Sequence, residues 1–179
     1  FLLSDQIRTD TPSAIEEIKG LNLTTEILSG DHSEQVKLIA EQLKVNKVQG
    51  GISPEGKLAY IQNLAPKEAT VMVGDGINDV PVLAQAPVSI AMGSASELAK
   101  NHADVILISN QIKHLPILIR QARRSARIIK QNLFWALLYN GSILPLAALG
   151  LIPPYAAAIG MSASSLVVVF NALRLNTVR

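Results

Sequence analysis

The sequence of 179 residues contains no cysteine, and this absence excludes two kinds of site. Neither a disulfide framework nor a thiolate metal site can form within the chain, because both need cysteine sulfur. The net charge is small, only +2, and aromatic residues are scarce, at 4% of the chain. A nucleic-acid-binding surface needs basic residues interleaved with aromatics, and the sequence lacks that pattern. We therefore expect no nucleic-acid partner.

Charged residues are missing altogether from residues 131–173. A stretch of this length cannot form a solvated surface, and it is long enough for two passes through a bilayer. Pro153-Pro154 divides it into segments 132–152 and 155–173. At ~1.5 Å per residue, each segment spans the ~30 Å hydrocarbon core. We predict a hairpin of two transmembrane helices within residues 132–175; a buried hairpin of a soluble protein is the alternative.

Basic residues flank both ends of this uncharged block, and residues 111–131 read as a basic amphipathic connecting helix. By the positive-inside rule, both ends of the hairpin are expected on the cytoplasmic side of the membrane. The flanking residues are Arg123, Arg124, Arg127 and Lys130 before the block and Arg174 and Arg179 after it.

Residues 1–110 alternate short apolar runs with amphipathic helical segments. This alternation is typical of an α/β domain with a mostly parallel sheet. Thr11-Pro12 predicts the N-cap and first residue of a helix that Gly20 ends. The other expected helices cover 33–44, the segment that begins at 53–54, and 111–130; the expected strands cover 23–28, 69–73, 88–92 and 103–108.

The string Gly74-Asp75-Gly76-Ile77-Asn78-Asp79-Val80-Pro81 follows an apolar strand directly. A parallel strand delivers its last residues to the edge of the sheet where ligands bind in α/β folds. Gly74 and Gly76 permit a phosphate or an ion to approach the backbone closely. Asp75 and Asp79 are hard oxygen donors of the kind that Mg²⁺ prefers. An ordinary strand-to-helix turn with acidic caps is the structural alternative.

This string resembles the hinge motif of the P-type ATPases, which belong to the haloacid-dehalogenase superfamily. Three further elements resemble the same family and occur in its order. Ser29-Gly30-Asp31 is similar to its TGD box, and Pro54-Glu55-Gly56-Lys57 to the box that supplies its lysine. Segments 90–93 and 103–107 resemble the strand pair after the hinge. The resemblance implies a partial haloacid-dehalogenase-like Rossmannoid domain in residues 1–110, followed by the two-helix transmembrane hairpin.

The resemblance also implies roles in phosphoryl transfer from ATP, with Mg²⁺ as cofactor. Such transfer gains mostly from positioning and from neutralising phosphate charge. Lys57 would face the phosphate, Asp75 would bind Mg²⁺, and Asp79 would hold that metal and Lys57. The further expected contacts come from Asn78 near the phosphate and from the Ser29 hydroxyl with Asp31 in support.

One part of the family's site is not in this sequence. The phosphorylated aspartate of the family lies in a DKTGT motif upstream of the segments seen here, and no such motif occurs in the chain. We therefore expect a C-terminal fragment that begins in mid-domain and cannot phosphorylate itself.

Polar residues in the uncharged block are candidates for binding a transported cation. Met161, Ser164 and Ser165 are spaced to share one helical face, although small residues there also suit helix packing. Together with Tyr139-Asn140 they resemble the signature of monovalent copper pumps. Met is a soft ligand that suits Cu(I). Zinc-type relatives carry an acidic residue and a lysine in these helices, and neither occurs here.

The sequence therefore predicts part of an ATP-driven pump that exports Cu(I) through an aspartyl-phosphate intermediate. The expected protein lies in a membrane, in bacteria the inner membrane, with its phosphorylation domain in the cytoplasm. Its expected partners are the lipid bilayer, the N-terminal part of the same pump and a copper chaperone. Two alternatives are a soluble phosphatase of the same superfamily and a membrane-tethered regulatory module with a degenerate phosphatase fold.

Overall fold

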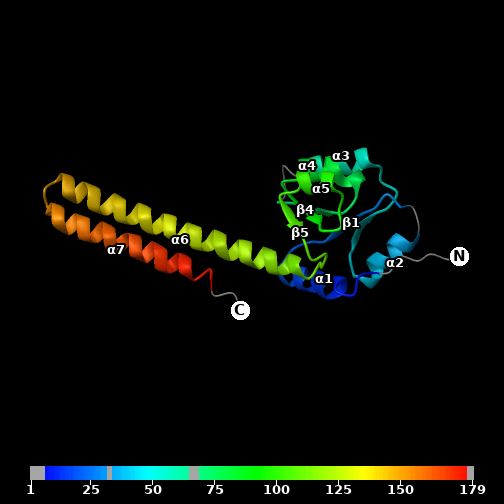
Figure 1. The fold of residues 1–179 in the computed structure, drawn as a ribbon, viewed down its shortest axis with the longest axis horizontal. Helices are drawn as coiled ribbons and strands as arrows, with labels where there is room; N and C mark the ends of the chain where they lie inside the picture. The colour runs from blue at the N-terminus through cyan, green and yellow to red at the C-terminus, as the bar shows by residue number, and fades with distance from the viewer. Residues whose placement is uncertain (1–6, 32–33, 65–68, 177–179) are drawn as a thin grey trace. The chain divides into compact units, whose positions relative to one another are not determined.

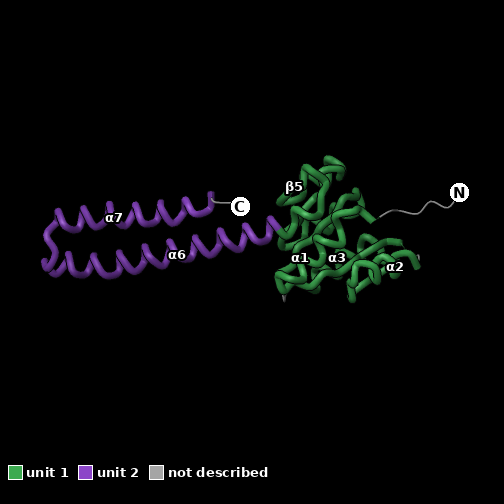
Figure 2. Tube along the Cα trace, turned by 90° about the horizontal axis from the view of Figure 1, so that it is seen from below, with its two compact units in different colours: residues 1–116 green, residues 117–179 purple. Residues whose placement is uncertain are grey.

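The structure is a computed structural model that describes residues 7–31, 34–64 and 69–176 (Figure 1). The chain divides into two compact units, residues 1–116 and residues 117–179 (Figure 2). The expectations for Ser33 and Arg179 lie outside the described residues.

The first unit contains two parallel sheets. In one, β1 (Glu26–Leu28) pairs with β2 (Lys47–Gln49). The other has the order β3-β4-β5, with β3 at Val71–Gly74, β4 at Val88–Met92 and β5 at Val105–Leu107. The central strand β4 is buried from Ser89 to Met92, as expected for a strand covered on both faces. The predicted parallel α/β class is confirmed.

Helices connect these strands and supply the rest of the core. After β3, the short helix η1 (Ile77–Asp79) leads into α4 (Val80–Gln85), and α5 (Glu97–His102) follows β4. Leu83, Ala91, Ala95 and Ala99 form one buried cluster between these elements. The remaining helices are α1 (Thr11–Gly20), α2 (Glu34–Gln42) and α3 (Pro54–Leu64).

A second cluster forms beneath α2. Val36 and Ala40 are the buried residues of α2, and Ala40 packs with Leu43 and Val45. Their spacing of three and four residues places the apolar side chains on one side of the helix.

One local prediction was wrong, and one strand was missed. The N-cap of α1 is Asp10 and not Thr11, because the Asp10 carbonyl accepts the hydrogen bond from the Ala14 amide. Strand β2 was not predicted, because only Val48 of its three residues is partly covered and the flanking Lys47 and Gln49 are exposed. A three-residue strand with polar ends has too little apolar pattern to be recognised.

The second unit is built from α6 (His114–Ala148) and α7 (Pro154–Leu173). The predicted connecting segment 111–131 and the predicted first membrane segment 132–152 belong largely to one continuous helix of 35 residues, with Pro145 inside it. The helix α7 begins one residue before the predicted 155–173 segment and ends at Leu173.

Hydrogen bonds between uncharged groups join the two helices of this hairpin. Asn171 Nδ2 donates to Asn132 Oδ1 at 2.8 Å, and Trp135 Nε1 donates to Ser164 Oγ at 3.0 Å. Nearer the tip, Tyr139 Oη donates to the Ala157 carbonyl at 3.2 Å. These contacts at successive levels show that the helices run antiparallel.

Among the described residues, one helix is long and apolar enough to cross a membrane, and that helix is α7. None of its residues is buried within the structure. The predicted first span, 132–152, is less apolar than α7, because Asn132, Tyr139 and Asn140 lie among its apolar residues.

Candidate functional site

The loop after β3 folds back on its own glycine. Gly74 is buried at the end of the strand, and η1 brings the Asp79 side chain against it. A Cβ atom at Gly74 would lie 3.1 Å from Asp79 Cβ and 3.2 Å from Asp79 Oδ2. Glycine is therefore needed here because of the close approach of Asp79.

Asp79 forms an ion pair with Lys57. Lys57 Nζ lies 2.8 Å from Asp79 Oδ1, and the two side chains are only 13% and 14% exposed. Lys57 belongs to the first turns of α3, whose start is capped by Ser53 Oγ accepting from the Gly56 amide. A shielded, hydrogen-bonded pair holds the lysine ammonium in one position. The structure brings these two predicted residues together, while their catalytic roles remain predictions.

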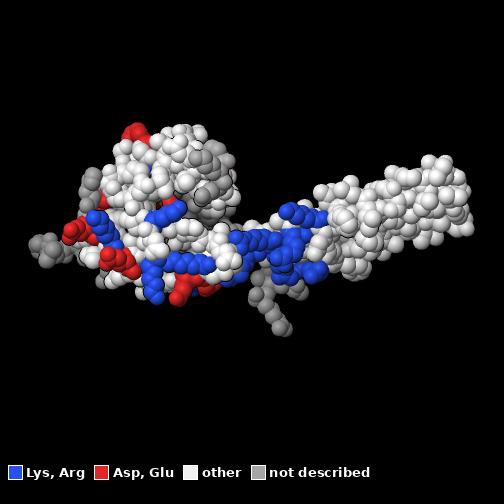
Figure 3. Space-filling model, turned by 180° about the vertical axis from the view of Figure 1, so that it is seen from behind, with Lys and Arg blue, Asp and Glu red and all other residues white. Residues whose placement is uncertain are grey.

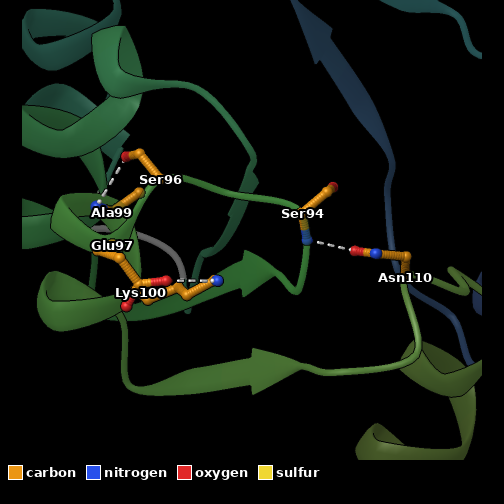
Figure 4. A network of polar contacts seen from close by, with 6 residues as sticks. All are labelled: Ser94, Ser96, Glu97, Ala99, Lys100 and Asn110. Atoms are coloured by element: carbon orange, nitrogen blue, oxygen red, sulfur yellow. Dashed lines mark hydrogen bonds and ion pairs between the residues drawn. The ribbon is translucent and has the colours of Figure 1, made fainter.

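Asp75 is the more accessible carboxylate of the loop, with its side chain 62% exposed. Arg8 Nη2 lies 3.9 Å from Asp75 Oδ2, and Arg8 Nη1 donates to the Asn110 carbonyl at 2.7 Å. The Ser94 amide in turn donates to Asn110 Oδ1 at 2.6 Å (Figure 4). Arg8 thus links the loop after β3 to the loops after β4 and β5.

Sequence reasoning missed Arg8. Arg8 lies before the first helix and belongs to no recognisable motif. Only the fold brings it close to Asp75. Asn78, which the sequence also singled out, is exposed within η1.

Ser29 and Asp31 lie where β1 ends. The Asp31 amide donates to Ser29 Oγ at 3.1 Å, which forms a tight turn. The Ser29 carbonyl accepts from the Ile52 amide, and the Asp31 carbonyl accepts from the Gly51 amide. These contacts connect the serine turn to the loop that enters α3, and so to the helix that carries Lys57.

Two other carboxylates of this unit have structural partners. Burial raises the pKa of Glu26, but the hydrogen bonds from Lys47 and Tyr60, both 2.6 Å long, lower it. Together with the charge of Lys47 they outweigh burial, so the pKa lies below its ordinary value. Hydrogen bonds from the amide and the hydroxyl of Ser89 lower the pKa of Asp104. Ser89 is 1% exposed, so this pair ties β4 to the start of β5.

The donor set can be compared with what Mg²⁺ needs. The described residues contain no group of three or more His, Asp or Glu side chains that could hold a metal by themselves. Mg²⁺ is usually bound by one or two carboxylates together with water and substrate phosphates. Asp75 and Asp79 on one short loop fit that mode of binding, with the exposed Asp75 as the more available ligand.

The five predicted cation-binding residues of the hairpin separate into two groups. Tyr139 and Ser164 contact the opposite helix through the hydrogen bonds to Ala157 and from Trp135. Met161 is 62% exposed and Ser165 is also exposed, with Ser165 Oγ donating to the Met161 carbonyl. Positions 161, 164 and 165 are neighbours on the continuous helix α7, as their spacing predicted, and Ser164 in addition contacts α6. Asn140 is exposed.

Gly160 allows Tyr139 to reach α7. A Cβ atom at Gly160 would lie 2.6 Å from Tyr139 Oη and 3.4 Å from its Cζ. A small residue at this position therefore lets the phenol lie against the helix backbone, as small residues do in membrane helix pairs.

Comparison with known proteins supports the assignment of the first unit. A family model for haloacid dehalogenase-like hydrolases matches residues 1–87. The structure also resembles a zinc-transporting PIB-type ATPase in its E2.Pi state, with a TM-score of 0.90, 34% identity and 96% of this chain covered. The first unit therefore has a haloacid dehalogenase-like fold.

The relatives define the chain more closely. It is 39% identical over 178 residues to a copper-exporting P-type ATPase of Staphylococcus haemolyticus (strain JCSC1435), with 99% of the chain covered. It is 42% identical over 180 residues to a probable cation-transporting ATPase of Haemophilus influenzae (strain ATCC 51907 / DSM 11121 / KW20 / Rd), with 100% covered. The chain belongs to the heavy-metal P-type ATPases.

The chain is short beside these proteins. It spans 22% and 25% of the length of the two relatives and 28% of the solved zinc transporter.

Proposed function

We propose that this chain is part of an ATP-driven pump that exports Cu(I) through an aspartyl-phosphate intermediate. In this proposal, residues 1–110 belong to the phosphorylation domain, 111–131 connect it to the membrane, and 132–175 form two spans. The observation that carries the proposal is the shielded Lys57–Asp79 pair beside Asp75, in a chain that matches heavy-metal P-type ATPases over nearly its whole length.

Lys57 acts on the phosphoryl group as a fixed positive charge. Asp79 holds its ammonium at 2.8 Å, so little reorganisation is needed when phosphate charge develops beside it. The Ser29 hydroxyl, at the end of the neighbouring sheet, donates to a phosphate oxygen. Asp75 and Asp79 hold Mg²⁺, which when bound neutralises charge on the transferred group. The nucleophilic aspartate comes from a part of the pump outside this sequence.

The preference for Cu(I) rests on the hairpin. Met161 contributes the single thioether between residues 131 and 173, and it is exposed on α7, where other helices of the pump can meet it. Soft sulfur donors favour Cu(I), whereas Zn²⁺ accepts carboxylate and imidazole ligands. Residues 132–175 contain no Asp, Glu or His. Copper therefore suits this chain better than zinc, although a structural relative transports zinc.

The location follows from the same helices. The helix α7 and the apolar part of α6 cross the membrane, and the basic residues before α6 enters it keep both ends in the cytoplasm. The proposal includes the bacterial inner membrane as the location and a cytoplasmic copper chaperone as the donor of the ion.

The test is Met161→Leu in the full-length protein, measured as ATP turnover stimulated by Cu(I) and by Zn²⁺. The change keeps volume and apolar character and usually costs less than ~1.5 kcal/mol of stability. Copper stimulation should fall sharply, while ATP binding stays unchanged because the phosphoryl site is outside the membrane.

Met72→Leu is the matched control, since Met72 packs against the core of the first unit and should leave copper stimulation intact. Undiminished copper stimulation of Met161→Leu, or stimulation of the wild type by Zn²⁺ instead of Cu(I), would contradict the proposed cargo.

A further inference from the structure

The charges of the chain are divided sharply along the sequence. Residues 1–104 contain all 14 acidic residues and eight of the 16 basic ones. Residues 105–179 contain the other eight basic residues and neither Asp nor Glu. Carboxylate side chains of residues 105–179 therefore cannot neutralise the basic residues of α6.

Five of these basic residues share one face of α6. Arg120, Arg123, Arg127 and Lys130 follow one another at steps of three or four residues, and Arg124 lies among them. Such steps place side chains on the same side of a helix, here over ~15 Å of its length. We call these five residues the basic stripe. All except Arg124 are exposed.

The basic stripe lies at one end of the uncharged hairpin. Arg124 Nη2 donates to the carbonyl of Arg174, which follows the last residue of α7, so both ends of the hairpin meet at the level of the stripe. Figure 3 shows Lys and Arg gathered beside the hairpin, while the hairpin beyond them carries no charge. In the proposed membrane pump, this end of the hairpin would lie among the phosphate groups of the lipids.

We propose that the basic stripe binds anionic phospholipid headgroups of the leaflet that α6 enters. Guanidinium groups match phosphate oxygens in a paired, planar geometry, and a row of them fits a layer of phosphates better than one soluble anion. This inference rests on the proposed membrane pump and adds a ligand to it.

Position along the stripe determines how much each residue contributes. Lys130 and Arg127 are next to the uncharged block, whereas Arg120 lies ten residues before Lys130, ~15 Å farther along the helix. Attraction to a charged surface falls within a Debye length of about 8–10 Å. The residues nearest the membrane should therefore bind lipid most strongly. A soluble acidic partner bound along the whole stripe would not produce such a gradient.

The experiment uses the full-length protein in detergent and measures retained lipid by native mass spectrometry. Phosphatidylglycerol is the anionic probe and phosphatidylcholine is the zwitterionic one. Wild type should retain phosphatidylglycerol preferentially. The double variant Arg127→Gln with Lys130→Gln should weaken that retention at least ~10-fold, since each basic residue near the surface contributes about fivefold. Arg120→Gln should weaken it less.

The matched control removes two exposed lysines of the first unit, Lys37→Gln with Lys44→Gln, and should retain the lipid as wild type does. An equal loss in this control would overturn the proposal. So would equal retention of the two lipids, displacement of phosphatidylglycerol by excess soluble glycerol phosphate, or full retention by the Arg127 and Lys130 variant. Copper-stimulated turnover in the same preparations tests the proposed pump separately.

Discussion

The contacts inside the first unit and those inside the second unit differ in their chemistry. In the first unit, carboxylates make many of the long-range contacts, as Asp79 does with Lys57 and Asp104 with Ser89. In the second unit there is no carboxylate side chain, and the helices meet through amide, indole and phenol hydrogen bonds around small residues. In the proposed pump, the ionised groups of the first unit face water and phosphate, and the uncharged hairpin lies in hydrocarbon, where burying a charge would be costly.

The comparison predicts that removing one carboxylate stops the first unit's chemistry and leaves the hairpin intact. In the full-length protein, Asp75→Asn keeps volume but removes a charge from the proposed Mg²⁺ site. Turnover should fall at least ~100-fold, which corresponds to about 2.7 kcal/mol of transition-state stabilisation. Steady-state ATPase assays measure it.

Asp104→Asn is the control for this change, because it removes a carboxylate that binds Ser89 at the opposite end of the neighbouring strand β4. Its turnover should stay close to that of wild type. Near-normal turnover of Asp75→Asn would show that Asp75 is not a metal ligand in the reaction.

A change in the hairpin should have the opposite pattern. Gly160→Val would force Tyr139 off α7 and should destabilise the hairpin by about 1–3 kcal/mol, as overpacking does. The thermal midpoint of the purified full-length protein measures this effect. Gly141→Val is the matched control, since a Cβ atom at Gly141 has no heavy atom within 4 Å. If both variants lose the same stability, helix propensity and not the Tyr139 contact explains the loss.

A smaller effect is expected from the single indole hydrogen bond. Trp135→Phe removes the donor to Ser164 and keeps an aromatic ring, and hydrogen bonds between membrane helices contribute about 0.6 kcal/mol on average. A double-mutant cycle with Ser164→Ala isolates the pair. The coupling energy measured by reversible unfolding in detergent should be favourable and of this size. Strictly additive single changes would mean that the bond does not stabilise the hairpin.

The smallest expected difference between the two units is in how their stability depends on pH. The pKa of Asp104 is lowered in the folded state, so its contribution to stability is present above the ordinary Asp pKa of ~3.9 and is lost as the pH falls below it. The pKa of Glu26 is lowered too and acts in the same direction. The second unit has no Asp, Glu or His side chain in residues 117–179 and should not respond.

Amide hydrogen exchange at neutral pH and near pH 3 would measure both units in one protein, after correction for the intrinsic exchange rates. Protection of the Ser89 amide should decrease at the lower pH, while protection within α7 stays unchanged. In Asp104→Asn the decrease at Ser89 should be smaller. An equal loss of protection in both units would contradict the assignment of acid sensitivity to the carboxylates.

The sequence by itself determined the parts of this protein that depend on local pattern. Strand β4 and helix α1 were predicted within one residue, and the uncharged block predicted α7, because apolar spacing and the absence of charge are properties of neighbouring residues. The loop from Gly74 to Asp79 was located because its residue types follow a strand directly.

The tertiary structure alone decided which distant side chains meet. Lys57 reaches Asp79 because α3 and the loop after β3 come together, and Arg8 reaches Asp75 from before the first helix. In the hairpin, Ser164 accepts a hydrogen bond from Trp135 of α6, whereas its neighbour Met161 on α7 stays exposed. Periodicity specifies which side of one element is apolar, but the packing of two elements determines which polar groups become partners.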